Sequence, residues 1–319
     1  MIRTKMTELL GIEYPILLGA MAWITTAGLV AAVSNAGGAG VLGSGGRDDT
    51  WVREQIQKTK TLTNRPFGIN VSLATTPMRD KIVDAIIEEG IDFVTLGAGD
   101  PRPFIGRFKD AGIKVVCIIP NTKLAKRVEA AGADMIVIEG MESGGRIGNL
   151  TTMALMTNVI PEVQLPVAAA GGIVDGRGLA AALVMGADGI QMGSRFLLAS
   201  ECESHRSNAE AIIQATDTDS CTIGWSRGKG LRGLKNRFAE RYLEMETSGV
   251  PTEELGKYVQ GCSRRVADLG QGEEETNGIV QVGEGLVPLK KIQPAAEIIR
   301  EVMREAEAIL KNAPALVQE

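Results

Sequence analysis

A ten-residue stretch, residues 139–148, combines glycines with charged side chains in a way that suits ligand binding. It holds four glycines together with Glu139, Glu142 and Arg146. Glycine lets a backbone turn tightly and approach a flat ligand closely. A plain connector needs neither so many glycines nor a charge cluster. We therefore interpret the stretch as a ligand-facing loop, the alternative being a glycine-rich surface turn.

Two further stretches suit a phosphate group. Gly171 and Gly172 follow one apolar run of strand length, and Gly193 and Ser194 follow the next. Glycine backbones can approach a phosphate closely, and a helix that begins there would point its free N–H groups at the anion. The hydroxyl of Ser194 could donate to a phosphate oxygen. Ordinary glycine-rich turns are the alternative for either stretch taken alone.

A third group of residues suits a planar ring. Met21 and Ala22 follow the first apolar run, and Asn70 ends the third, where its amide could offer a donor and an acceptor to a ring edge. Glu139 could accept from a ribityl hydroxyl or a ring nitrogen. A phosphate at one end and a planar ring at the other describe FMN. No G-x-G-x-x-G turn follows a first strand, so the sequence does not support a Rossmann-type NAD site.

These residues need a scaffold that brings strand ends together, and the sequence predicts one. Short, continuously apolar runs alternate with segments of helical periodicity, as expected for parallel strands buried on both faces. Eight βα units predict a (β/α)8 TIM barrel with its site at the carboxyl ends of the strands, the alternative being a doubly wound open sheet. The predicted strands are residues 15–19, 39–43, 67–71, 92–97, 114–119, 134–139, 166–171 and 188–193.

The βα period breaks after the eighth run, which predicts three parts of the chain. Residues 1–200 would form the FMN-binding barrel. Residues 201–285 show helix-like and glycine-rich segments without strand alternation, and predict a helical insertion over the barrel mouth. Residues 286–319 would contain a C-terminal helix, at 288–312, that packs back on the barrel through an apolar stripe. The stripe is Ile292, Ala295, Ile299, Val302, Ala306 and Ile309.

The composition excludes several other classes of function. The chain has 319 residues, 44% of them hydrophobic, and a net charge of −5, which gives no general attraction to nucleic acid or to an anionic membrane. We find no run of 18 apolar residues and no signal peptide, so the cytoplasm is the expected location. Four cysteines lack C-x-x-C spacing, and the sole histidine, His205, is expected to be structural.

Several motifs together resemble the nitronate monooxygenase (2-nitropropane dioxygenase-like) superfamily. The resemblance covers residues 3–304, and within the superfamily the chain is most similar to the FMN-dependent enoyl-[acyl-carrier-protein] reductases. The motifs that carry it are YPI at 14–16, GAMAW at 19–23, AGGAG at 36–40, PFGIN at 66–70, the loop at 139–148, AAGGI at 169–173 and MGSRF at 192–196.

The resemblance implies an FMN-bound barrel and an oxidoreductase. NADH or NADPH would reduce the flavin, and FMN N5 would deliver hydride to an enoyl thioester. The alternatives are nitronate monooxygenase and NAD(P)H:quinone reductase activity. Carried over by position, the residues that would contact FMN are Met21, Ala22, Asn70, Glu139, Ser143, Gly144, Gly171, Gly172, Gly193 and Ser194.

The chain departs from the family at one catalytic position. The reductases and monooxygenases have a histidine directly after the paired glycines, and here that residue is Arg146. Arginine stays charged and cannot act as a general base, so the proton donor is left open. Arg146 could hold an anionic group of a substrate, or it could be a solvated loop charge. Its presence favours the quinone reductase branch, which works without that histidine.

The expected partners are small molecules or acyl thioesters. A basic cluster in the predicted insertion could dock an acyl carrier protein or the phosphates of NAD(P)H, or could be a solvated helix face. A flavin-free aldolase or isomerase barrel would need a lysine or a carboxylate base at a strand end, and Lys114 begins its strand. The sequence leaves the oligomeric state open, a homodimer being one option. The cluster is Arg227, Lys229, Arg232, Lys235, Arg237 and Arg241.

Overall fold

A computed structural model describes residues 2–76, 78–271 and 277–317, and within them the predicted barrel is present. Eight parallel strands form one sheet in the order β1-β9-β8-β6-β5-β4-β3-β2. A parallel bridge between Leu17 and Ala39 joins the first and last of these strands and closes the sheet. The strands are β1 Ile16–Leu18, β2 Gly40–Gly43, β3 Phe67–Ser72, β4 Phe93–Gly97, β5 Lys114–Ile119, β6 Met135–Glu139, β8 Val167–Ala170 and β9 Gly189–Met192.

Aspartates that precede three strands have a structural role. Asp92, Asp134 and Asp188 were predicted as first strand residues, but each lies one residue before its strand. Each carboxylate instead accepts a hydrogen bond from the backbone N–H at the start of the neighbouring strand, with N···O distances of 3.1, 2.8 and 3.0 Å respectively. These bonds lie at the amino ends of the strands, the stabilising face of a barrel, so the opposite face remains for chemistry.

Helices cover the outside of the barrel between successive strands. Thr151 caps the helix that begins at Thr152, because its side chain accepts from Ala154 N at 3.3 Å. The helix that contains Leu124 begins after Asn121, whose side chain accepts from Leu124 N at 2.9 Å. α1 Lys5–Leu10 precedes β1, and the helices between strands are α2 Ala27–Asn35, α3 Asp49–Leu62, α4 Arg79–Glu89, α5 Arg102–Asp110, α6 Thr122–Ala130, α7 Thr152–Val159 and α8 Gly176–Val184.

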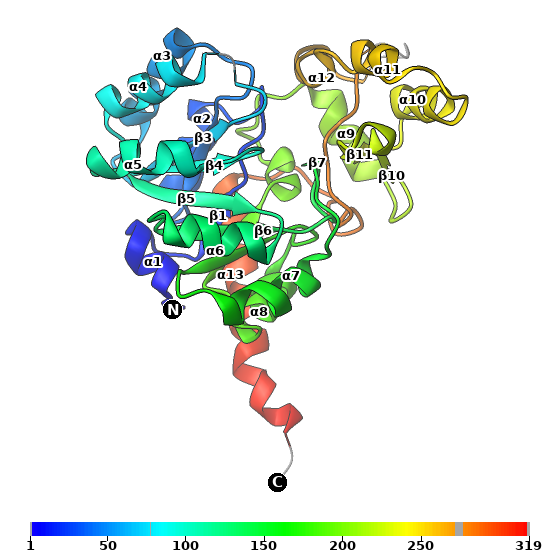
Figure 1. Cartoon of the computed structure of the whole chain (residues 1–319). Coiled ribbons are helices and arrows are strands. Elements are labelled where there is room, and N and C mark those ends of the chain that lie inside the picture. The colour runs from blue at the N-terminus through cyan, green and yellow to red at the C-terminus, as the bar shows by residue number, and fades with distance from the viewer. Residues whose placement is uncertain (1, 77, 272–276, 318–319) are drawn as a thin grey trace.

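The segment after β9 is not purely helical, which corrects one expectation. Its described residues form four α-helices, α9 Arg206–Gln214, α10 Arg237–Thr247, α11 Thr252–Tyr258 and α12 Cys262–Leu269. It also contains two strands, β10 Ser220–Ile223 and β11 Leu231–Leu234, which pair antiparallel. A third strand, β7 Gly145–Arg146, comes from the loop after β6 and pairs with β11. Figure 1 shows this insertion beside the barrel, with β7 at the junction. The boundaries at 200 and 285 stay predictions.

The C-terminal helix completes the ring of helices around the barrel. It is α13 Ala295–Asn312, so the predicted start at residue 288 was seven residues too early. It packs against α8 and α2, which places it as the eighth barrel helix after the long insertion. Ala295, Ile299, Val302 and Ala306 are buried as predicted, whereas the two ends of the predicted stripe, Ile292 and Ile309, are exposed. The far end of α13 extends beyond the barrel (Figure 1).

No helix among the described residues combines the length and the apolar character that crossing a bilayer requires.

Candidate functional site

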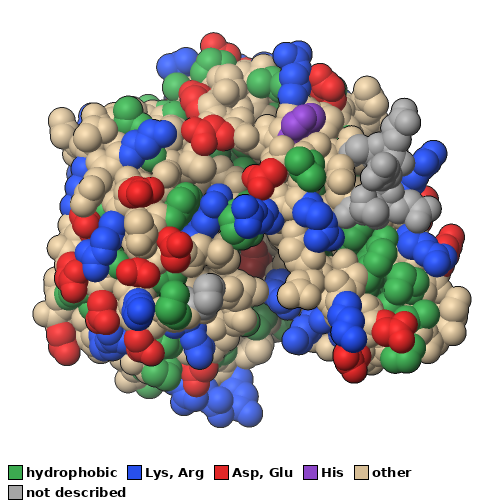
Figure 2. Space-filling view, turned by 90° about the horizontal axis from the view of Figure 1, so that it is seen from above, with side chains coloured by type: hydrophobic (Ala, Val, Ile, Leu, Met, Phe, Trp, Pro, Cys, Tyr) green, Lys and Arg blue, Asp and Glu red, His purple; other side chains and the backbone are tan. Residues whose placement is uncertain are grey.

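A cavity of about 970 Å³ opens at the carboxyl ends of the barrel strands, between the barrel and the insertion. Figure 2 shows this face of the molecule, hollowed between two lobes. The structure brings all the residues predicted from the sequence to the wall of this one cavity. They are Met21, Ala22, Asn70, Glu139, Ser143, Gly144, Arg146, Gly171, Gly172, Gly193 and Ser194.

The loops after β8 and β9 form one end of the cavity. Gly171 and Gly172 have φ values of +104° and +71°, which L-residues rarely adopt. Gly193 differs, because it has an ordinary φ of −104° and a Cβ placed on it would meet only the Met21 sulphur, at 3.9 Å. Space beside Gly193 is therefore open to a ligand. The hydroxyl of Ser194 accepts from Gly283 N at 2.9 Å, so its hydrogen is directed elsewhere and can be donated.

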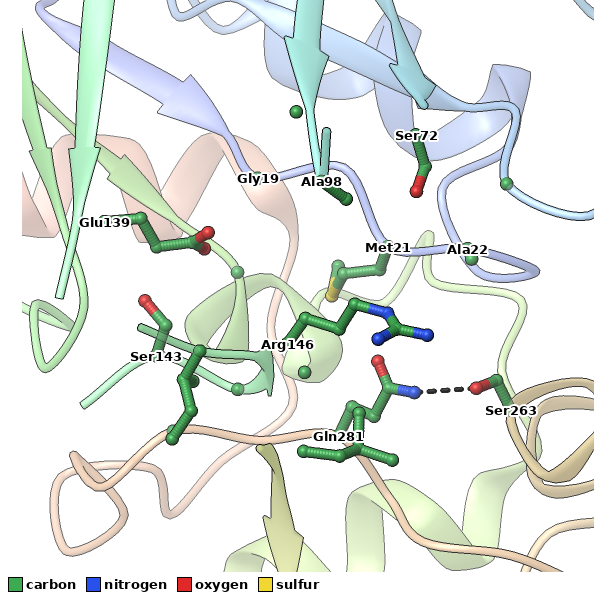
Figure 3. Close-up of a pocket in the computed structure, with 18 of the residues that line it drawn as sticks. Gly19, Met21, Ala22, Ser72, Ala98, Glu139, Ser143, Arg146, Ser263 and Gln281 are labelled. Carbon is green, nitrogen blue, oxygen red and sulfur yellow. Dashed lines mark hydrogen bonds between the residues drawn. The ribbon is translucent and has the colours of Figure 1, made fainter. Parts of the chain in front are cut away.

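Glu139 and Ser143 lie side by side on the cavity wall at the end of β6 (Figure 3). Burial raises the pKa of Glu139 from 4.5 to about 7, and a hydrogen bond from Ser143 acts in the opposite direction. The burial effect is larger because an ionised carboxylate loses water that one hydroxyl does not replace. Glu139 can therefore exchange a proton near neutral pH.

The loop after β6 is held rigidly by contacts that the sequence did not reveal. The carboxylate of Glu142 accepts from both the N–H and the hydroxyl of Thr152, at 2.9 and 3.0 Å. Gly140 must lack a side chain, because a Cβ there would lie 2.1 Å from Thr152 Oγ1. A Cβ on Gly144 would lie 2.7 Å from the Val282 backbone. These two glycines therefore serve chain packing, while Glu142 anchors the loop to the start of α7.

Arg146 projects into the middle of the cavity from β7 (Figure 3). Its backbone is fixed because β7 pairs with β11, with Arg146 opposite Leu231. Among the described residues, its guanidinium has no ion pair and no side-chain hydrogen bond. Arginines at a protein surface can form such pairs. A guanidinium that lies in a cavity without one is available to bind an anion.

Asn70 offers less than predicted. Its side-chain nitrogen donates to Thr95 O at 3.2 Å and to Thr95 Oγ1 at 2.8 Å. Both amide hydrogens are thus engaged by β4. The carbonyl oxygen remains as an acceptor, so Asn70 can present one hydrogen-bonding function to the cavity rather than two.

Trp23 closes one side of the mouth, a role that the sequence did not show. Its φ of +71° is unusual for a bulky residue. The guanidinium of Arg47 lies 3.9 Å from a Trp23 ring centroid, and that of Arg264, from α12 of the insertion, lies at 5.0 Å. Trp23 therefore links barrel and insertion through cation–π contacts.

Gln281 and Ser263 also line the cavity, facing Arg146 (Figure 3). Gln281 Nε2 donates to Ser263 Oγ at 2.6 Å, which holds the amide in place. Both residues lie in the insertion, far from the barrel loops in sequence. No motif pointed to them, because their place depends on how the insertion docks.

The predicted basic cluster is not one surface. Arg232 is buried, donates to Met141 O at 3.0 Å and forms an ion pair with Glu284 at 2.8 Å. Arg241 pairs with Glu244 on α10. Only Arg227 and Lys229 of the cluster line the cavity. The solvated-face interpretation thus suits Arg241, whereas Arg232 joins the insertion to the loop after β6.

His205 has the structural role predicted for it. It lies at the exposed start of α9, where its Nδ1 accepts from Ser207 N at 3.3 Å. Within the described residues, no group of three His, Cys, Asp or Glu side chains could hold a metal ion. Of the lysines that the structure describes, Lys229 alone lines the cavity, and it lies on the insertion rather than at a strand end.

Comparison with known proteins places this site in a family. A model of the nitronate monooxygenase family matches residues 3–305. FabK from Thermotoga maritima is 38% identical and superposes with a TM-score of 0.95, over 99% of this chain and 100% of that one. A probable nitronate monooxygenase from Staphylococcus aureus is 29% identical, over 97% of this chain and 99% of that protein.

A third relative covers less of the chain. It is the (3aS,4S,5R,7aS)-5-hydroxy-7a-methyl-1-oxo-octahydro-1H-indene-4-carboxyl-CoA dehydrogenase of Rhodococcus jostii, 41% identical over 200 residues. The match spans 63% of this chain and 56% of that protein, a little over half of its length. Family model and full-length relatives agree on the class. The chain belongs to the nitronate monooxygenase family, whose members are flavin-dependent oxidoreductases.

Proposed function

We propose that the protein is an FMN-dependent enzyme that reduces a C=C bond activated by a thioester, with NADH or NADPH as electron donor. The observation that carries the proposal is the unpaired guanidinium of Arg146, which β7 holds in the centre of the cavity. A cation there suits a substrate that develops negative charge on oxygen, as an enoyl thioester does when it accepts hydride.

The cavity residues fit FMN. Gly193 leaves open space beside the loop after β9, and Ser194 has a hydroxyl hydrogen to donate, which together suit a phosphate. Glu139 and the free carbonyl of Asn70 supply acceptors further along the wall. When bound, FMN supplies hydride transfer through N5. Met21, Ala22, Ser143, Gly144, Gly171 and Gly172 would form the remaining contacts of the cofactor site.

Polar side chains of the protein would stabilise charge and exchange protons. Arg146 would hold the thioester oxygen and stabilise charge there, and it remains protonated throughout. Glu139 is suited to proton exchange, since burial brings its pKa to about 7. Gln281, fixed by Ser263, adds a neutral polar group opposite Arg146. This division replaces the histidine that the resemblance led us to expect.

Two other reactions are also compatible with the unpaired guanidinium of Arg146. A nitronate is an anion that Arg146 could hold, and the full-length relative from Staphylococcus aureus carries the name of a probable nitronate monooxygenase. A quinone would gain negative charge on oxygen when reduced. The thioester is favoured because the carboxyl-CoA dehydrogenase is 41% identical over 63% of this chain, whereas the probable monooxygenase is 29% identical over 97% of it.

An anaerobic half-reaction experiment separates the three. The FMN-loaded protein is bleached with NADH or NADPH and then mixed with crotonyl-CoA, a benzoquinone or a primary alkyl nitronate. Rapid flavin reoxidation by the thioester is the expected result. Reoxidation by quinone or nitronate but never by a panel of enoyl thioesters would overturn the proposal, and a protein that takes up no FMN would remove its basis.

A further inference from the structure

Among the described residues, three of the four cations on the cavity wall come from the insertion, opposite the acids of the barrel side, and the fourth is Arg146. The acidic residues on the wall are Glu139 and Glu142, both on the barrel side, and Glu142 is engaged by Thr152. The insertion contributes Arg227, Lys229 and Arg264 to the opposite side, in a chain whose net charge is −5. Lys and Arg side chains lie around the rim of the hollow in Figure 2. A cleft lined by one sign of charge concentrates ligands of the opposite sign.

Arg227 and Lys229 are presented by one pinned turn between β10 and β11. Gly224 O accepts from the backbone N–H groups of both residues, at 3.2 and 3.1 Å. Neither side chain forms an ion pair among the described residues. By contrast, Arg264 pairs with Asp268 at 3.4 Å and stacks on Trp23, so it is partly engaged.

A spare hydrogen-bond donor lies beneath this turn. Tyr242 is fully buried, lines the cavity, and its hydroxyl has no hydrogen-bond acceptor among the described residues. Arg227 lies beside the hydroxyl but carries only donors. A buried hydroxyl without an acceptor is unfavourable, so this one is better explained by an acceptor that arrives with a ligand.

We infer that Arg227, Lys229 and Tyr242 form a site for the phosphates of a nucleotide tail, and that this tail is that of a coenzyme A thioester. The inference rests on the proposed function and names its substrate class. A carrier protein would instead need unpaired cations on an outward surface. There Arg241 is paired with Glu244, Arg232 is buried and Lys235 is one exposed lysine, whereas Arg227 and Lys229 lie together on a turn that lines the cavity. NADPH carries similar phosphates, so the test includes it.

The test measures binding to the FMN-loaded protein by titration calorimetry, which requires no turnover. The probes are CoA, 3′-dephospho-CoA, pantetheine, NADPH and NADH. The wild-type protein should bind CoA more tightly than pantetheine. In the Arg227→Gln/Lys229→Gln double variant that preference should fall by roughly ten-fold or more, and raised salt should reduce it in the wild-type protein. Lys235→Gln, an exposed lysine of the insertion outside the cavity wall, serves as the control and should change nothing.

A single-atom variant gives a second readout. Tyr242→Phe removes only the hydroxyl and should weaken CoA binding by a few-fold while leaving pantetheine unchanged. Tyr258→Phe is the matched control, because the Tyr258 hydroxyl donates to Phe238 O at 3.4 Å rather than lining the cavity.

The possible results of these titrations distinguish CoA from NADPH as the molecule that carries the phosphates. Loss confined to CoA and its derivatives supports the inference, and loss confined to NADPH reassigns the same phosphate site to the electron donor, which overturns the CoA assignment. Unchanged affinity for every probe would overturn the site itself. Since CoA carries no acyl group, failure here is distinct from a flavin that thioesters do not reoxidise.

Discussion

At the scale of single residues, Arg146 decides the chemistry. Arg146→Gln should lower kcat/KM for an enoyl thioester by about 10² to 10³, the usual effect of removing one donor to a developing oxyanion. Because the side chain has no partner among the described residues, the free energy of unfolding should change by less than about 0.5 kcal/mol. Steady-state kinetics and urea unfolding measure the two effects.

Arg146→Lys is the matched control and should recover part of the activity, because the charge is kept while the planar fork is lost. Equal kcat/KM in the Gln variant and the wild-type protein would make Arg146 a solvated loop charge. A rise in activity on Arg146→His would instead show that arginine blocks an inherited site.

Alanine substitutions at two glycines near the proposed phosphate site should differ in their effects on stability and on FMN affinity. Gly193→Ala should leave the FMN-free protein as stable as before, since a Cβ meets no atom closer than 3.9 Å, yet weaken FMN about ten-fold or more. Gly171→Ala should destabilise the FMN-free protein by about 1–3 kcal/mol. Its φ is +104° and its Cβ would lie 2.8 Å from Thr152 Oγ1. Thermal unfolding without FMN and fluorescence titration with FMN distinguish the two variants. Unaltered FMN affinity in Gly193→Ala would place the phosphate elsewhere.

At the scale of elements, the small sheet β7-β11-β10 joins barrel and insertion through Arg232. Arg232→Met leaves Met141 O without its donor and breaks the pair with Glu284, so unfolding should become easier by about 1–3 kcal/mol. FMN affinity should fall as well, because the loop that carries Ser143 loses an anchor. Denaturant titration and FMN binding report both.

Arg241→Met is the comparison variant for that experiment, since its exposed pair with Glu244 should contribute under about 0.5 kcal/mol. Equal effects of the two substitutions would contradict a bridging role for Arg232.

The elements also show what the sequence could and could not predict. The eight barrel strands were predictable because strands buried on both faces read as continuous apolar runs. Strands β10 and β11 were missed because they are short and of mixed polarity, and β7 has two residues and a partner about 85 positions away, a separation that local patterns do not encode. The start of α13 was misjudged because the apolar spacing continues upstream to Ile292, which the fold leaves exposed.

The same division holds for the site. The glycine loops and Glu139 were predictable because a barrel gathers the ends of its strands. The insertion brings Gln281, Ser263 and Tyr242 to the cavity only when it docks on the barrel. The spacing of residues in the sequence does not predict that docking. Likewise, the sequence could not show that the amide hydrogens of Asn70 are already engaged, because their acceptor, Thr95, lies on the neighbouring strand.

At the scale of the whole molecule, stability should depend on pH through Glu139. Its pKa is about 7 when folded against 4.5 for the ordinary carboxyl, so the folded FMN-free protein binds the proton more tightly than the unfolded chain does. This contribution is fully present below about pH 4.5 and is lost as pH rises through about 7. The melting temperature of the FMN-free protein should therefore carry a falling component across that window.

Glu139→Gln should remove that component, since an amide does not titrate. Glu254→Gln, an exposed position on α11, is the control and should leave the pH profile unaltered. A wild-type profile identical to that of Glu139→Gln between pH 4.5 and 7 would contradict the raised pKa.

Trp23 makes the docking of the two lobes observable by light. Its indole lies at the seam, with Arg47 on the barrel and Arg264 on the insertion as neighbours. Any outward swing of α12 would remove Arg264 and change the emission of this tryptophan. The same indole lines the cavity proposed for a flavin, which absorbs in the range where tryptophan emits. The protein thus contains an intrinsic optical probe at the seam that also lines the cavity, without any attached dye.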